Sequence, residues 1–191
     1  RPYLDIKKVV GEIPEKSRVA FDPKKVCCAL IESLPENCKE VEVDGLVDKL
    51  KCVKNRVEIE NLKEVMVRDG IAVCRFLHWL EKKIGNERVT ELSAARKLRE
   101  LREEQPDLQD LSFPTIAAYG EHAALPHYSA NAESDAELRP KGLFLFDSGG
   151  NYLGGTTDVT RTVALGAVSA EMRRDYTLVL KGVVNLSRHR I

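Results

Sequence analysis

The stretch that decides the fold is LFLFDSGGNYLGGTTDVTRTVA, residues 143–164. Its first part is apolar up to Phe146, and its second part, from Thr156 to Val163, is rich in β-branched residues, so both parts are typical of strands. Glycines and an asparagine lie between them, which is the composition of a turn. The stretch therefore predicts an antiparallel hairpin.

Two aspartates, Asp147 and Asp158, lie eleven residues apart in this hairpin. A turn centred between Tyr152 and Leu153 would place them directly opposite each other, where like charges about 5 Å apart are destabilising. A shared proton would relieve the repulsion, and so would one or two divalent cations. The alternative is a slipped register in which one aspartate caps the turn. The hairpin alone leaves these alternatives open.

The rest of the chain predicts short elements before residue 55 and long helices after it. Strands at 18–21 and 40–43 flank a helix at 24–33, which suggests the edge of an α/β layer. Apolar residues at helical spacing predict a long helix from about residue 57 that stops at Gly85, with Gly70 as a weak point. Thr90 is expected to cap a second helix that runs to about Glu104.

Beyond Pro106 the pattern changes to strands, and Ser169 is expected to cap a last helix. Helices followed by an antiparallel run predict an α+β fold. The predicted strands in this part are residues 113–119, 125–129, 142–148 and 155–165.

Composition limits the classes of function. Thirty basic residues balance thirty acidic ones, so charge gives no argument for nucleic acid or an anionic membrane as a partner. No apolar run is long enough for a transmembrane helix. Five cysteines without a CxxC spacing favour buried, reduced thiols and a cytoplasmic location. The first residue is Arg1 rather than Met, which suggests a fragment or a processed product.

Four segments resemble the aminopeptidase P branch of the creatinase/methionine aminopeptidase superfamily, whose catalytic domain has the "pita-bread" fold. They are FDSGGNYLGGTTDVTRTVALG (146–166), SFPTIAAYGEHAALPHYSA (112–130), VEIENLKEVMVRDGIAVCRFLHWLE (57–81) and RVAFDPKKVCCALIES (18–33). The resemblance implies that residues 1–54 are the C-terminal part of a non-catalytic creatinase-like α/β middle domain. Residues 55–191 would then be the N-terminal half of a pita-bread catalytic domain.

The resemblance also implies a chemistry. Members of the family remove the N-terminal residue from peptides with proline second, and two divalent metals, usually Mn²⁺, hold the attacking water. By this resemblance Asp147 is a terminal metal ligand, Asp158 bridges both metals, and His127 lies beside the peptide substrate. His122 is expected to be structural. Thr160 and Thr162 share a strand face with Asp158, so one hydroxyl is a candidate to support the ligands. Family members often dimerise, so a homodimer is a candidate assembly.

The family's site also needs one His and two Glu from later strands. After Asp158 the chain offers Glu171, Asp175 and His189, and none of them resembles a ligand motif. Two carboxylates alone make a poor transition-metal site, so we expect the chain by itself to be inactive. The alternatives are a catalytically dead pita-bread module that binds partners, and a prolidase-like dipeptidase fragment.

Overall fold

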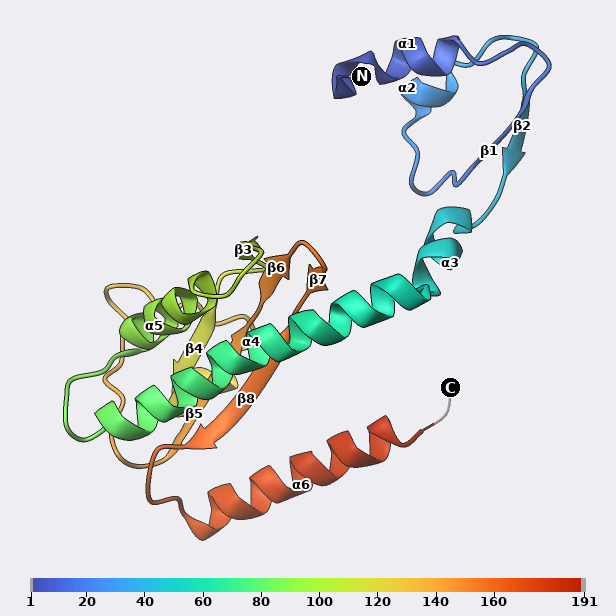
Figure 1. Ribbon diagram of the computed structural model, residues 1–191. Helices are drawn as coiled ribbons and strands as arrows, with labels where there is room; N and C mark the ends of the chain where they lie inside the picture. The colour runs from blue at the N-terminus through green and yellow to red at the C-terminus, as the bar shows by residue number, and fades with distance from the viewer. Residues whose placement is uncertain (1, 190–191) are drawn as a thin grey trace. The chain divides into compact units, whose positions relative to one another are not determined.

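The computed structural model describes residues 2–189 and divides into two compact units (Figure 1). The first unit extends to Asn55 and the second begins at Arg56. The second unit carries the predicted aspartates, so it holds the candidate site.

The first unit contains a parallel strand pair, β1 (Arg18–Phe21) and β2 (Lys39–Glu42). The predicted strand–helix–strand order is confirmed, although the helix between the strands, α2 (Cys28–Ile31), is shorter than predicted. The Asp22 carboxylate links the segment after β1 to the segment after β2, because it accepts hydrogen bonds from the backbone N–H groups of Lys24 and Gly45, both at 2.9 Å. The remaining helices of this unit are η1 (Tyr3–Asp5), α1 (Ile6–Gly11) and α3 (Leu46–Cys52).

Two helices begin the second unit. The first is α4 (Arg56–Lys83), which runs unbroken through Gly70, since one helical glycine costs only about 1 kcal/mol relative to alanine and the helix recovers this by burying an apolar stripe. The second is α5 (Glu91–Glu103), which begins as predicted at Thr90. The Thr90 hydroxyl accepts the backbone N–H of Ser93, while the Ser93 hydroxyl accepts that of Thr90.

The strands of the second unit form two small antiparallel sheets. One has the order β4-β5-β8, and the other has the order β3-β6-β7. The first sheet contains β4 (Ile116–Tyr119), β5 (Leu143–Ser148) and β8 (Val159–Ala164), and the second contains β3 (Leu108–Leu111), β6 (Gly150–Tyr152) and β7 (Gly155–Thr156). The predicted strand at residues 125–129 is wrong, because the chain there turns after a short helix, η2 (Gly120–Ala124). Helices and antiparallel sheets together make the α+β fold that was predicted.

The core lies between the β4-β5-β8 sheet and the pair α4 and α5 (Figure 1). Burial alternates along β5, so Phe144, Phe146 and Ser148 face the helices and are fully buried. Phe146 packs edge-on against Phe76 of α4, with ring centroids 5.2 Å apart. Asp147 therefore points to the opposite face of the sheet, away from the helices.

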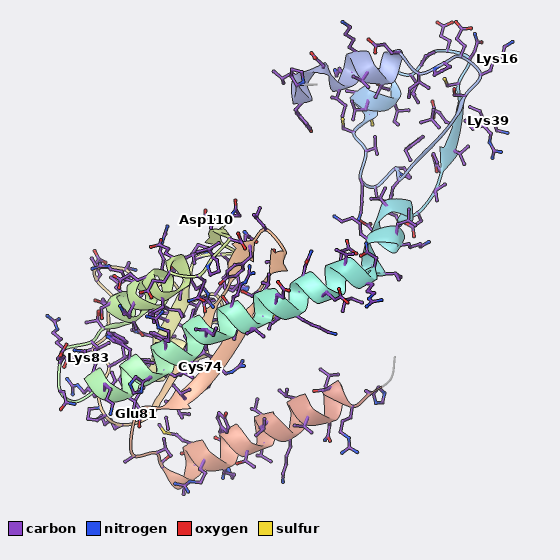
Figure 2. All side chains as sticks on the ribbon, in the orientation of Figure 1. Lys16, Lys39, Cys74, Glu81, Lys83 and Asp110 are labelled. Carbon is purple, nitrogen blue, oxygen red and sulfur yellow. The ribbon has the colours of Figure 1, made fainter. Side chains whose placement is uncertain are left out.

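The last helix, α6 (Ala170–Ser187), begins where Ser169 accepts the backbone N–H of Met172 at 3.1 Å. No residue of α6 is buried, and Figure 2 shows its side chains projecting along its length. Its exposed apolar residues include Met172, Tyr176, Val179 and Val183. Across residues 2–189, no helix combines the length and the apolar character needed to cross a membrane.

Candidate metal centre

The predicted register of the aspartate hairpin is wrong, because the turn lies one residue later in the sequence than predicted. Tyr152 pairs with Gly155, so the turn consists of Leu153 and Gly154. Along the same hairpin Asp147 therefore pairs with Thr160 rather than with Asp158. Because a two-residue turn fixes the register of the strands that flank it, moving the turn by one position moves the cross-strand partner by two.

Asp147 and Asp158 nevertheless remain on the same face of the hairpin. Asp158 precedes Thr160 by two residues, just before β8, and side chains two apart in an extended chain share a face. Asp147 and Asp158 are thus diagonal neighbours, with a regular ladder placing their Cβ atoms about 7 Å apart. Asp158 is exposed and Asp147 is half-buried. The diagonal arrangement reduces their repulsion relative to a directly opposed pair.

Thr160 holds the Asp147 carboxylate in place. Its hydroxyl donates a hydrogen bond to Oδ1 of Asp147 at 2.7 Å. No hydrogen bond reaches Oδ2 from the part of the chain that the structure describes, so this oxygen can still bind a cation. The other candidate, Thr162, pairs with Leu145 further along β8 and lines a groove with Leu143 and Met172. Of the two threonines, Thr160 is therefore the one seen to hydrogen-bond to a candidate ligand.

Between the β5–β8 strand pair and the turn, the backbone at Gly149 passes close to the backbone at Thr157. We call this close approach the crossing at Gly149. A Cβ atom on Gly149 would collide with the carbonyl oxygen of Thr157, so the close approach requires glycine. The Thr157 hydroxyl accepts the backbone N–H of Gly150 at 2.9 Å, and the Ser112 hydroxyl donates to the Thr157 carbonyl at 3.0 Å. These contacts interrupt the ladder beside Asp158 and fix where that residue leaves the sheet.

His127 lies on an exposed turn of the same unit. It has φ +58°, which is uncommon for a residue other than glycine. Pro126 precedes it, and the backbone N–H of Tyr128 donates to the carbonyl of Leu125 at 3.2 Å, closing a β-turn. Left-handed backbone at a non-glycine residue is a form of strain that functional sites often hold, which motivates a role for this imidazole.

The described residues bring no third candidate ligand to the two aspartates. Within residues 2–189 no group of three or more His, Cys, Asp or Glu side chains is arranged to hold a metal ion. Glu171 and Asp175 lie on exposed positions of α6, where Arg174 pairs with both, so they form part of a solvated helix face. Asp147 and Asp158 therefore suit a metal in donor type and common face, but they supply only part of a coordination shell.

The prediction of buried cysteines is wrong. Four of the five thiols are exposed, and Cys38 is half-buried. Cys74 illustrates the reason, because it lies on the solvent side of α4 beside the stripe that faces the core (Figure 2). Apolar neighbours in a helical sequence do not by themselves place a residue on the buried face.

Two buried carboxylates, those of Asp69 and Glu91, were not predicted from the sequence. Asp69 of α4 is fully buried and pairs with Arg102 of α5 through Nε–Oδ1 and Nη2–Oδ2 distances of 2.7 and 3.1 Å. Glu91, the first residue of α5, is fully buried as well. Asp69 had a signal, since it lies four residues from both Val65 and Val73 on the apolar stripe of α4.

Comparison with known proteins identifies relatives over most of the chain. A family model described as metallopeptidase family M24 matches residues 60–189. Aminopeptidase P1 from Lotus japonicus is 38% identical over 187 residues, covering 86% of this chain and 28% of the relative. A probable Xaa-Pro aminopeptidase P from Chaetomium globosum is 42% identical over 147 residues, covering 76% of this chain and 24% of the relative.

Solved structures give the same picture. An X-prolyl aminopeptidase from Caenorhabditis elegans, described as a cytosolic enzyme with a di-nuclear active site, matches with TM-score 0.84 and 35% identity. The match covers 99% of this chain and 32% of that one. An Xaa-Pro dipeptidase from Bacillus anthracis matches with TM-score 0.73 and 26% identity, over 95% of this chain and 50% of that one. The chain thus spans less than a third of the length of the curated relatives described above.

Proposed function

The chain belongs to metallopeptidase family M24, and we propose that it carries the first part of the two-metal site of an Xaa-Pro aminopeptidase. Its α+β architecture corresponds to part of the pita-bread fold of that family. On this proposal residues 55–191 are the N-terminal half of the catalytic domain. Residues 1–54 are the end of a creatinase-like middle domain.

One observation carries the proposal. Asp147 and Asp158 share the face of the β5–β8 hairpin that points away from the helical core, and Thr160 between them hydrogen-bonds to Asp147. A hydrogen-bonded carboxylate with a free second oxygen is the usual state of a metal ligand. Carboxylates alone on an ordinary strand surface would gain nothing from being brought together.

The roles of the residues follow from this arrangement. Asp147 would be a terminal ligand and Asp158 a bridging ligand of two divalent metals, for which we propose Mn²⁺. When bound, such metals polarise a carbonyl oxygen and lower the pKa of a water molecule. His127 would contact the peptide, where an imidazole can donate to a developing charge or move a proton. The substrate class is a peptide with proline in the second position.

The choice among related activities rests on similarity. Identity is higher to the C. elegans aminopeptidase than to the B. anthracis dipeptidase, at 35% against 26%. This favours the aminopeptidase over a prolidase-like activity. The retained pair of aspartates argues against a module that serves only as a scaffold. We further propose a cytosolic location, in line with the C. elegans enzyme, and a homodimer as the assembly.

The experiment is a Mn²⁺ titration followed by the electron paramagnetic resonance signal of the free ion. The wild-type chain is compared with Asp147→Asn, Asp158→Asn and the control Asp175→Asn, whose carboxylate lies on the exposed face of α6. We expect weak binding by the wild type and the control, and a large loss in the other two variants. Equal binding by all four proteins would refute the proposed ligands.

An assay of peptide hydrolysis tests the incompleteness of the site. With Mn²⁺ and a peptide that has proline second, we expect no turnover by the 191-residue chain above the level seen with a chelator. The reason is that the described residues provide too few ligands for a hydrolytic metal pair. Robust turnover by this chain would contradict that reasoning.

A further inference from the structure

A buried carboxylate lies beneath the segment that carries His127. Glu91 is 0% exposed, and it follows the capping residue Thr90 at the start of α5. Burial of a carboxylate is costly unless hydrogen bonds replace its water. Every contact of Glu91 that meets this need comes from residues 119–136, the segment around His127.

The two oxygens of Glu91 bind both ends of that segment. Oε1 accepts the backbone N–H of Tyr119, at the end of β4, at 2.6 Å. Oε2 accepts the backbone N–H of Ala136 at 3.2 Å. A return contact closes the ring, since the backbone N–H of Glu91 donates to the Ala136 carbonyl at 3.1 Å. One side chain thus joins the first and last residues of an 18-residue excursion, counted from 119 to 136.

The middle of the segment is held by the same carboxylate. The hydroxyl of Tyr128 donates to Oε2 at 2.8 Å, and Tyr128 directly follows His127. His122 places Nδ1 at 2.9 Å from Oε1 and 3.1 Å from Oε2. Because a carboxylate only accepts, Nδ1 carries the proton. The His122 ring also stacks on Tyr128, with centroids 4.6 Å apart and planes 25° apart.

We propose that Glu91 is a positioning residue for His127: by binding Tyr119, Tyr128 and Ala136 together it fixes the turn on which the imidazole is displayed. This inference rests on the proposed function only in one respect, namely that His127 contacts the peptide substrate. It assigns His122 a supporting role, since that imidazole contacts Glu91 and Tyr128. His127 itself contributes no anchoring hydrogen bond from among the described residues, so its position depends on its neighbours.

The proposal explains how an exposed turn keeps its unusual backbone. His127 has φ +58° on an exposed turn, and such a conformation persists only when the surroundings over-determine it. Tyr128 supplies that constraint from the next residue, through its hydroxyl and its stacked ring. Burial raises the pKa of Tyr128, so its hydroxyl remains a donor throughout the neutral range.

The test uses Glu91→Gln in the 191-residue chain. A glutamine amide presents an NH₂ group where one carboxylate oxygen was, so that group would face the donors of Tyr128 and Ala136 instead of accepting from them. We expect the amides of residues 128 and 136 to exchange with solvent at least about tenfold faster than in the wild type, beyond any change in the α4 amides. We also expect His127 to lose the strong intraresidue HN–Hα Overhauser effect that marks a positive φ.

A milder pair of variants keeps the proposal testable if Glu91→Gln does not fold. Tyr128→Phe removes a hydroxyl that donates to buried Glu91, while Tyr152→Phe removes one that donates to buried Asp69 at 2.9 Å. The two changes are matched in chemistry and burial. Loss of the positive-φ signal of His127 in Tyr128→Phe but not in Tyr152→Phe supports the proposal. Retention of that signal in Tyr128→Phe, or its loss in both variants, overturns it.

A final arm separates this proposal from the proposed function. An Xaa-Pro peptide is added to the wild type and to Tyr128→Phe while the ring signals of His127 are observed. A shift in the wild type that is reduced in the variant supports both proposals. No shift in the wild type removes the substrate role of His127, and the anchoring by Glu91 is then decided by the exchange and Overhauser measurements alone. An equal shift in both proteins overturns the positioning role.

Discussion

At the scale of single residues, the hydrogen bond from Thr160 to Asp147 supports the proposal that Asp147 is a metal ligand. The hydroxyl fixes one oxygen of the carboxylate at 2.7 Å and so orients the other. Groups that orient a ligand in this way typically contribute about 10- to 100-fold to metal affinity. The same bond would be of little use to an aspartate that only caps a turn.

Thr160→Val therefore tests the role of this hydroxyl. Valine keeps the shape and strand preference of threonine but donates no hydrogen bond to Asp147. We expect the Mn²⁺ affinity to fall about 10- to 100-fold with little change in the unfolding midpoint. The control is Thr162→Val, on the same strand but in the groove with Leu143 and Met172. Equal losses in both variants would remove the special role of Thr160.

At the scale of secondary-structure elements, the hairpin depends on the crossing at Gly149. A side chain there would meet the carbonyl of Thr157, whereas a side chain at Gly70 of α4 would meet nothing within 4 Å. We expect Gly149→Ala to destabilise the chain, because backbone atoms must move. We expect Gly70→Ala to stabilise it by about 1 kcal/mol, because alanine is the better helix former. Urea unfolding of both variants measures the difference, and shifts of the same sign would contradict the account.

A buried network joins the tip of this hairpin to the helices. The hydroxyl of Tyr152 donates to Asp69, which also holds Arg102 through two hydrogen bonds. Breaking such a pair by removing one partner typically costs about 3–5 kcal/mol, because a charge is left buried. The network thus ties α4, α5 and β6 together next to the turn of the hairpin.

The phenol of Tyr152 makes stability depend on alkaline pH. Burial, and then the charge of Asp69, raise the pKa of Tyr152 above its ordinary value of 10.0. The folded state therefore keeps a proton that the unfolded state loses, so this contribution is complete below pH 10.0 and is lost as the pH rises above it. We expect Tyr152→Phe to be less stable than the wild type at pH 8 but to lose less stability between pH 9 and about 11. A control, Tyr176→Phe on exposed α6, should follow the wild type, and the same behaviour in Tyr152→Phe would contradict the assignment.

Local signals predicted the elements better than their pairing. The apolar stripe of α4 and the cap at Thr90 lie within one helix each, so they are readable from sequence. The hairpin register is not, because Tyr152-Leu153 and Leu153-Gly154 are both possible turn pairs in this glycine-rich stretch, and the structure uses the second. A strand at residues 125–129 was predicted from a run between glycine and proline breaks, but the left-handed backbone at His127 excludes it. The hydrogen bonds of buried Glu91 could not be predicted either, because they come from residues up to 45 positions away.

At the scale of the whole molecule, α6 presents an apolar stripe that the described structure covers only in part, where Met172 and Tyr176 line a groove with Leu143 and Thr162. Met172, Tyr176, Val179 and Val183 follow helical spacing on one face and are exposed. Exposed apolar surface of this kind favours association. We expect the chain to self-associate at high concentration, and Val179→Glu with Val183→Glu to reduce this more than Leu178→Glu on another face. Light scattering after size exclusion measures the mass, and an equal effect of both changes would contradict the stripe.

The central claim, that Asp147 and Asp158 hold metal, is tested most directly by nuclear magnetic resonance with Mn²⁺. A paramagnetic ion broadens the signals of nearby amides, so a substoichiometric amount locates its own site. The account predicts that the amides of residues 147, 158 and 160 broaden at lower Mn²⁺ levels than the amides of residues 171 and 175. Earlier broadening around Glu171 and Asp175, or uniform broadening across the chain, would contradict it.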